Sequence, residues 1–161
     1  MIRPNKLLYN LFRPSAKLVR YYVHPQAWIG GQIFSSFGIK VRRDNFSGIP
    51  GAIFTPRKNV NTKSIIFYLH GGGYCFGSSL TTHKVGLTKL AKQTGSVCYS
   101  VDYRLAPEHQ YPAALDDALT AWKHIVSQNP NCNIILAGDS AGGGLSLALM
   151  MYLRDNNELL P

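Results

Sequence analysis

Acidic residues are scarce in this sequence, and they are unevenly distributed. The 161 residues contain 17 Lys and Arg but only 8 Asp and Glu. Residues 1–63 hold 11 of the basic residues and a single acid, Asp44, whereas residues 64–161 hold 6 basic residues and 7 acids. The net charge of +9 therefore belongs to the N-terminal part of the chain. It does not define the chemistry of the C-terminal part.

Cysteine is also rare, and long apolar runs and the common cofactor motifs are missing. The 3 cysteines cannot all pair, and Cys98 lies in an apolar segment, so we expect free, buried thiols and a cytoplasmic location. No run of about 18 apolar residues could span a membrane. The sequence has no metal-ligand cluster, nucleotide-phosphate loop or nucleic-acid motif. We therefore expect no metal, no cofactor and no nucleic-acid partner.

Residues 1–37 predict a short helical segment with a basic face. Apolar residues recur at helical spacing on both sides of Pro14, which favours two amphipathic helices broken at that proline. A mitochondrial-type presequence fits the charge of this segment but not its low serine content. A helix lying on an acidic membrane surface fits both the charge and the amphipathicity. We favour helices packed on the rest of the protein, and keep weak membrane contact as the alternative.

Residues 38–161 alternate between strand and helix patterns. Short strands are expected at 39–44 and 52–55, separated by a turn at 46–51 and followed by a polar loop at 57–63. The expected order is then strand 64–69, helix 84–94, strand 97–101, a helix opened by Pro112, strand 134–137 and a last helix. This order predicts an α/β fold with a mostly parallel sheet and helices on both faces. Ligands of such sheets bind beyond the carboxyl ends of the strands.

A serine lies where the last predicted strand turns into the last predicted helix. The sequence Gly-Asp-Ser-Ala-Gly at 138–142 is a Gly-x-Ser-x-Gly pattern in a strand–turn–helix setting, which is typical of a nucleophile elbow. A serine hydroxyl is a weak nucleophile and needs a sharp turn where a base and backbone N–H groups can reach it. A glycine-rich loop capping an ordinary helix is the simpler explanation of the pattern, but it leaves the setting unexplained.

A second glycine-rich stretch follows the strand at 64–69. His70 is followed by three glycines, Gly71, Gly72 and Gly73, which permit positive φ angles and let backbone N–H groups point into open space. Such a stretch alone also fits a phosphate-binding loop. Because both glycine-rich stretches fall at carboxyl ends of predicted strands, we expect them to meet in one site. An oxyanion hole is then the natural role of the stretch at 70–73.

Three stretches together resemble the α/β-hydrolases of the hormone-sensitive-lipase type, a family of carboxylesterases. They are His-Gly-Gly-Gly-Tyr at 70–74, Asp-Tyr-Arg-Leu-Ala-Pro-Glu-His at 102–109 with Tyr-Pro-Ala-Ala-Leu-Asp-Asp-Ala at 111–118, and Gly-Asp-Ser-Ala-Gly-Gly at 138–143. The stretches occur in the family's order. The resemblance implies a small-molecule ester as substrate, a cap formed by residues 1–37, and the N-terminal part of an α/β-hydrolase domain in residues 38–161.

The resemblance also implies roles for individual residues. Ser140 would be the nucleophile. The developing oxyanion would be held by backbone amides of the two motifs, namely those of Gly71, Gly72, Gly73 and Ala141. His70 and Asp139 would be structural residues of those motifs. The charged residues at 102–109 would be scaffold, not part of a catalytic triad.

The sequence lacks a histidine after this serine. In α/β-hydrolases the triad acid and base follow the nucleophile, but all five histidines precede Ser140, and only Asp155 and Glu158 are acidic after it. No triad acid or base is therefore identified in this chain, and we expect an incomplete α/β-hydrolase fold whose last strand has an unpaired edge. Loss of triad members costs up to about 10⁶ in kcat, so we expect poor turnover by this chain alone.

Two functions remain open at this stage. The first is serine-dependent hydrolysis of carboxylic esters through an acyl-enzyme at Ser140. The alternative is a non-catalytic truncated hydrolase, or a module that binds a small ligand in the former acyl pocket. The sequence leaves the oligomeric state undetermined.

Overall fold

A computed structural model describes residues 20–21 and 37–161 of the chain. Arg20 and Tyr21 are helical. The two amphipathic helices predicted for residues 1–37 therefore lie largely outside the described residues.

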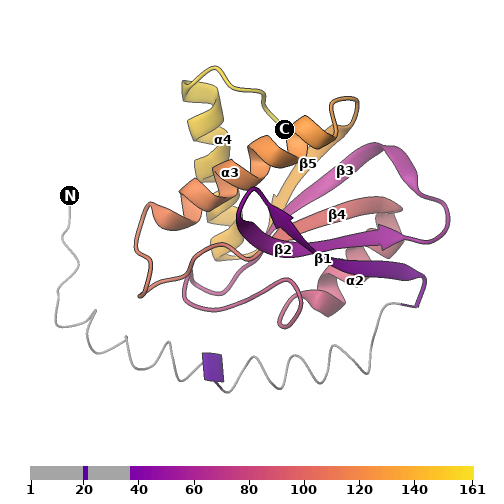
Figure 1. Ribbon diagram of the computed structural model, residues 1–161, viewed down its shortest axis with the longest axis horizontal. Helices are drawn as coiled ribbons and strands as arrows, with labels where there is room; N and C mark the ends of the chain where they lie inside the picture. The colour runs from indigo at the N-terminus through magenta and orange to yellow at the C-terminus, as the bar shows by residue number, and fades with distance from the viewer. Residues whose placement is uncertain (1–19, 22–36) are drawn as a thin grey trace.

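Five strands form one mixed sheet (Figure 1). They are β1 (Ile39–Phe46), β2 (Ile49–Pro56), β3 (Asn61–Leu69), β4 (Ser96–Val101) and β5 (Asn133–Gly138). The strand order is β1-β2-β4-β3-β5. β3 is parallel to β4 and to β5, whereas β2 is antiparallel to both of its neighbours, β1 and β4. Four strands therefore run in one direction and only β2 is reversed, which confirms the predicted mostly parallel sheet.

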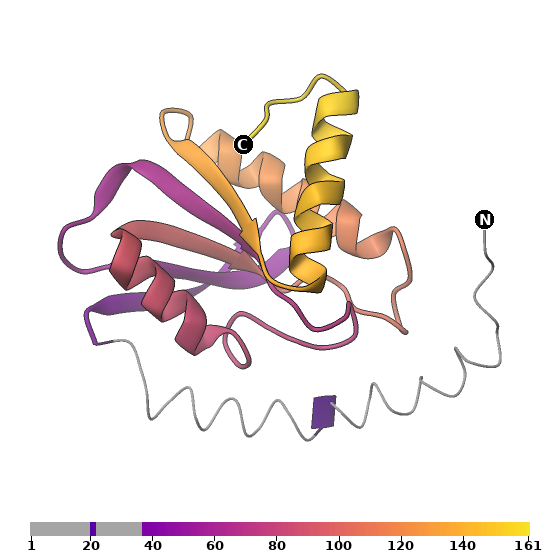
Figure 2. The same cartoon turned by 180° about the vertical axis from the view of Figure 1, so that it is seen from behind.

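Three described helices each follow one of the parallel strands β3, β4 and β5, and together they cover the two faces of the sheet. They are α2 (Lys84–Thr94), α3 (Ala113–Gln128) and α4 (Ala141–Asp155). Figures 1 and 2 show α3 and α4 on one side of the sheet and α2 on the other. The alternation along β3 explains this arrangement, because successive side chains of a strand point to opposite faces. Ile66 packs in the cluster that includes Leu87 of α2, whereas Phe67 packs in the cluster of α3 and α4.

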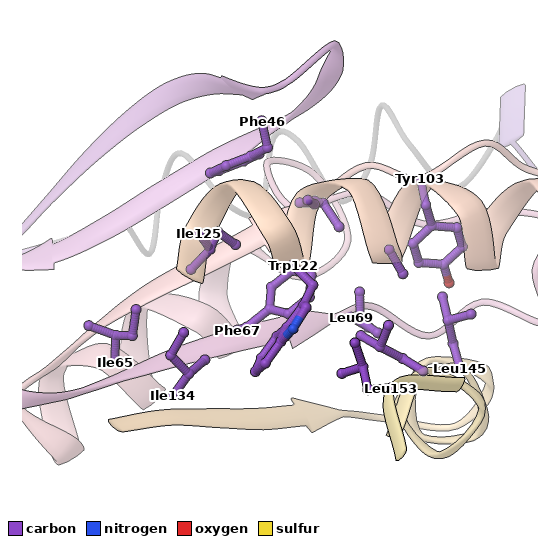
Figure 3. Packing of buried hydrophobic residues seen from close by; sticks show 14 of the residues in the cluster. Phe46, Ile65, Phe67, Leu69, Tyr103, Trp122, Ile125, Ile134, Leu145 and Leu153 are labelled. Atoms are coloured by element: carbon purple, nitrogen blue, oxygen red, sulfur yellow. The ribbon is translucent and has the colours of Figure 1, made fainter. Parts of the chain in front are cut away.

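The larger core lies between the sheet and the pair α3 and α4 (Figure 3). Trp122 of α3 is 2% exposed, and its ring centroid lies 6.3 Å from that of Phe67 in β3. The smaller core, under α2, includes Cys98, which is fully buried. Burial raises the pKa of the Cys98 thiol to about 12. Cys75, Cys98 and Cys132 are all free, but only Cys98 is buried as expected, whereas Cys75 and Cys132 are half-buried.

The structure corrects two predicted loops. The turn expected at 46–51 is only Ser47 and Gly48, both with positive φ (56° and 97°). Positive φ at both central residues matches the right-handed twist of a tight hairpin, so the strands continue up to it. The loop expected at 57–63 is also shorter, because β3 begins at Asn61. The exposed first part of β3 is polar and therefore carries no apolar strand pattern.

None of the helices formed by the described residues combines the length and the apolarity that a bilayer crossing requires.

Candidate active site

Ser140 follows Asp139 in the two-residue turn between the end of β5 and the start of α4. Its backbone angles are φ 48° and ψ −121°, a combination that costs a non-glycine residue of the order of 1–3 kcal/mol. Such strain persists only where the surroundings fix it, and it turns the exposed serine side chain out of the strand–helix junction. The strand–turn–helix setting inferred from the sequence is therefore present.

Two glycines allow the sharp turn around Ser140. A Cβ atom on Gly142 would collide with the carbonyl oxygen of Leu69 and would lie 2.7 Å from that of His70. A Cβ atom on Gly138 would lie 2.5 Å from the carbonyl carbon and oxygen of Gly142. The first turn of α4 therefore packs directly on the end of β3, and this contact brings the serine turn beside the loop that follows β3.

The loop after β3 folds back sharply on itself. Gly72, Gly73 and Tyr74 all have positive φ, at 122°, 59° and 59°, and the carbonyl oxygen of Gly72 accepts the backbone N–H groups of Cys75 and Phe76 at 3.0 and 3.1 Å. Within residues 37–161, no acceptor takes the amide hydrogens of Gly72, Gly73 or Ala141. Backbone donors free of an internal partner, beside a projecting serine, are what an oxyanion hole requires.

Asp139 links this loop to the serine turn. Its Oδ1 accepts the Gly71 N–H at 2.8 Å and the Tyr68 hydroxyl at 2.9 Å, and it lies 3.2 Å from His83 Nε2. A Cβ atom on Gly71 would collide with the Asp139 carboxylate. The Gly71 amide, one of the predicted oxyanion donors, therefore donates to Asp139 in this structure.

The hydrogen bonds to Asp139 change its acidity. Burial acts to raise the pKa of Asp139, but the bonds from Tyr68 and Gly71 and the nearby His83 together outweigh burial and lower it. Conversely, burial and the bond to Asp139 raise the pKa of Tyr68 to about 12. Asp139 is therefore held as a carboxylate that accepts from three directions.

His70 is enclosed in the loop and is fully buried. Its ring stacks on Tyr103 with a centroid distance of 4.3 Å, and its Nδ1 donates to the carbonyl oxygen of Gly71 at 2.8 Å. Burial is the main cause that lowers the pKa of His70. The backbone oxygen of His70 accepts the Tyr103 hydroxyl at 2.5 Å. Both the ring and the backbone carbonyl of His70 therefore take part in contacts that hold the loop in place.

The charged residues at 102–109 make contacts away from Ser140. Asp102 accepts the backbone N–H and the hydroxyl of Ser79, at 2.6 and 2.5 Å. Arg104 forms an ion pair with Asp117 at 2.8 Å, and Glu108 forms one with Arg20 at 2.8 Å. These bonds agree with the expected scaffold role.

No triad partner of Ser140 lies in the described part of the chain. Among residues 20–21 and 37–161, no side chain hydrogen-bonds the Ser140 hydroxyl. His83 contacts the residue before this serine, with its Nε2 lying 3.2 Å from Asp139 Oδ1. No periodic signal could have found its contact, because it joins the start of α2 to a loop 56 residues later.

The comparisons with known proteins assign the family. A family model described as the alpha/beta hydrolase fold matches residues 66–161, which include both glycine-rich loops. The chain belongs to the α/β-hydrolase family. Among its relatives, an "Esterase" of Acinetobacter venetianus is 36% identical over 125 residues, covering 76% of this chain and 40% of the relative. Human "Arylacetamide deacetylase-like 2" is 35% identical over 130 residues, covering 75% of this chain and 32% of the relative.

Solved structures of this α/β-hydrolase family agree. A homologue of hormone-sensitive lipase from a metagenome library, EstE7, matches with a TM-score of 0.77 and 31% identity, covering all of this chain and 55% of that one. The esterase of Pyrobaculum calidifontis matches with a TM-score of 0.76 and 31% identity, covering 98% and 55%. The chain therefore has the fold of these hydrolases but spans only about half the length of the solved chains, and 32–40% of the two relatives above. This share agrees with the expected incomplete fold.

Proposed function

We propose that this chain carries the nucleophile and the oxyanion hole of a serine carboxylesterase. The observation that carries the proposal is the strained backbone of Ser140, at φ 48° and ψ −121° between β5 and α4. Ser140 Oγ attacks the carbonyl carbon of an ester, and the carbonyl oxygen becomes an oxyanion. The amides of Gly72, Gly73 and Ala141 donate to it. Each such donor is worth about 2.7–4 kcal/mol in the transition state.

Asp139 and His70 serve this proposed site by position. Asp139 directly precedes Ser140 and accepts the Gly71 N–H. This bond holds the loop after β3 at a fixed distance from the serine turn, and these two segments supply the donors of the proposed oxyanion hole. His70 fills the space beneath the loop and stacks on Tyr103. Neither residue needs to touch the ester in this proposal.

Full turnover also needs a base that takes the proton of the serine hydroxyl and passes it to the leaving alcohol. The residues after Ser140 in this chain include no histidine. We therefore expect the 161-residue chain to be acylated slowly and deacylated more slowly still. A small-ligand binding module is the second candidate function, and the observation favouring it is that no described side chain bonds to the Ser140 hydroxyl.

Acylation of Ser140 separates these two functions. The chain is incubated with p-nitrophenyl acetate, with and without added imidazole as an external base, and the acetylated residue is located by peptide mass spectrometry. We expect an acetyl group on Ser140, formed faster with imidazole and absent in Ser140→Ala.

The matched control is Ser47→Ala. Ser47 is an exposed serine whose hydroxyl lies 2.9 Å from His124 Nδ1, on a turn without a paired oxyanion loop. We expect Ser140 to be acetylated in this variant at the same rate as in the parent chain. Acetylation that is spread over several serines, or that persists in Ser140→Ala, would contradict the esterase proposal and leave the binding module as the better candidate.

A further inference from the structure

A cavity of about 980 Å³ lies at the end of the sheet where β3 and β4 begin. Its volume is at the upper end of the roughly 300–1,000 Å³ of small-molecule sites. The 9 residues of β3 separate it from the serine turn and span roughly 25–30 Å. The cavity is therefore not part of the proposed ester site. Three segments line it, namely residues 37–39, 56–59 and 92–95.

Backbone contacts hold the walls of this cavity in place. The Arg57 N–H donates to the carbonyl oxygen of Gly38 at 2.9 Å, and the Asn61 N–H donates to that of Gly95 at 2.8 Å. Gly95 packs closely on the loop after β2, since a Cβ atom on it would lie 2.7 Å from the carbonyl oxygen of Asn59. This loop is thus tied both to the start of β1 and to the end of α2. A ligand that enters the cavity does not have to order its walls.

Three cations and no acid line the cavity. Arg57, Lys58 and Lys92 are exposed, and none of them forms an ion pair with another described residue. Lys92 lies in the last turn of α2, where its charge offsets the partial negative charge of the helix C-terminus. Arg57 and Lys58 lie outside that helix. Their two positive charges therefore remain without compensation.

The sequence around the cavity supplies no counter-charge. Residues 1–101 contain a single acid, Asp44, and its carboxylate pairs with Arg42 at 2.8 Å. Residues 1–36, which precede the cavity-lining Phe37, contain no acidic side chain. They offer no carboxylate partner to Arg57 or Lys58. An anion that neutralises these two cations therefore has to come from outside this part of the chain.

The lining of the cavity suits a phosphate group that is attached to an apolar group. Arg57 offers a planar fork of N–H donors that matches two phosphate oxygens, and Lys58 adds a point charge. Asn59 and Gln93 bring side-chain amides, which can donate to further oxygens. Phe37 also lines the cavity and is 92% exposed, so that an aromatic ring of a ligand can stack on it.

We propose that this cavity binds a small phosphate monoester, whose phosphate pairs with Arg57 and Lys58 and whose apolar group contacts Phe37. The second pKa of a phosphate monoester is about 6, so the group is mainly a dianion at neutral pH, and two cations match its charge. The site is independent of the proposed function, because binding here needs neither Ser140 nor a catalytic base.

The test is binding of phenyl phosphate to the 161-residue chain at low salt, followed by NMR of the backbone amides. Benzyl alcohol supplies a ring without the charge, and inorganic phosphate supplies the charge without the ring. We expect phenyl phosphate to shift the signals of Lys58, Asn59 and Gly95, inorganic phosphate to bind more weakly, and benzyl alcohol to leave these signals unchanged. Equal binding of phenyl phosphate and benzyl alcohol, or shifts confined to other residues, would overturn the proposal.

Two exposed arginines supply the matched variants. Arg57→Gln removes one charge from the cavity and should weaken phenyl phosphate binding by about tenfold or more. Arg43→Gln removes the same charge from an exposed position of β1 that does not line the cavity, and it should leave binding unchanged. Phe37→Ala should reduce the affinity for phenyl phosphate to that for inorganic phosphate. An equal loss in the two arginine variants would indicate general charge attraction and overturn the site.

A phosphate monoester occurs both in soluble molecules and in lipid headgroups, and a second arm of the experiment separates these sources. Vesicles of phosphatidylcholine that contain phosphatidic acid, whose headgroup is a phosphate monoester, are compared with vesicles of phosphatidylcholine alone. Co-sedimentation that is lost in Arg57→Gln and kept in Arg43→Gln assigns the site to a lipid headgroup. Co-sedimentation that does not depend on Arg57, together with Arg57-dependent binding of phenyl phosphate, assigns it to a soluble molecule. Binding of neither probe through Arg57 overturns the proposal.

Discussion

Asp139 shows at the scale of one residue how a carboxylate can hold two loops together. It accepts from Tyr68 and Gly71 and contacts His83, while its own backbone belongs to the serine turn. We expect Asp139→Asn to lower the free energy of unfolding by about 1 kcal/mol at neutral pH. Hydrogen bonds to buried charges contribute roughly 1.5–3 kcal/mol. Because the Asp139 side chain is 47% exposed, solvent screens its charge, and we expect about 1 kcal/mol instead of the larger contribution of a buried charge.

This contribution should depend on pH in a defined direction. Since the pKa of Asp139 is lowered in the folded protein, its stabilisation is complete above the unfolded pKa of about 3.9 and is lost as the pH falls through the folded value. In urea unfolding, the difference between the parent chain and Asp139→Asn should therefore shrink from about pH 7 to about pH 3. Asp155→Asn, at an exposed acid paired with the adjacent Arg154, should change little. A pH-independent difference at position 139 would contradict this explanation.

At the scale of elements, the spacing of apolar residues and the positions of glycine and proline predicted most of the fold. The apolar run in β3 and the helical spacing in α3 both mark buried surfaces, which is why those elements were found in order. The limits of β1 and β2 were missed, because positive φ at Ser47 made a two-residue turn where the glycines and Pro50 indicated a longer one.

In the candidate site, too, the sequence predicted the local motifs but not the contacts between distant segments. Ser140 and the glycines form contiguous motifs, so the sequence revealed them. The bond from Gly71 to Asp139 and the contact of His83 join segments far apart in the chain, and they depend on how β3, β5 and α2 pack. No local pattern encodes such contacts, and the engaged Gly71 amide therefore required the structure.

A substitution at Gly142 tests how closely α4 packs on β3, and one at Gly86 in α2 serves as its control. Gly142→Ala places a Cβ against the backbone oxygens of Leu69 and His70, which cannot move without shifting β3. We expect a loss of about 1–3 kcal/mol in the free energy of unfolding, as for other overpacked sites. Gly86→Ala is the matched control, because Gly86 lies inside α2 and has open space around its Cβ position. It should stabilise the chain by up to about 1 kcal/mol. Urea unfolding of both variants measures the contrast, and equal effects would contradict it.

At the scale of the whole molecule, the two edges of the sheet differ. The β1 edge carries exposed Lys40, Arg42 and Arg43, and charges of this kind discourage pairing with another chain. β5 forms the other edge among the described residues, and its Ile135 is 50% exposed. On the adjoining helix, Leu147 and Met151 are 62% and 55% exposed. An open strand edge beside exposed apolar side chains favours association.

We therefore expect the 161-residue chain to self-associate through the β5 and α4 side. Leu147 and Met151 are four residues apart and share one face of α4, so the double variant Leu147→Glu, Met151→Glu should place two like charges on that face and shift the chain towards monomer. The double variant Gln93→Glu, Gln128→Glu adds the same charge on exposed positions of α2 and α3, and it should associate like the parent chain. Sedimentation velocity over a range of concentrations measures all three. A parent chain that stays monomeric, or a control that dissociates as fully as the α4 variant, would show that net charge or another surface governs association instead of this face.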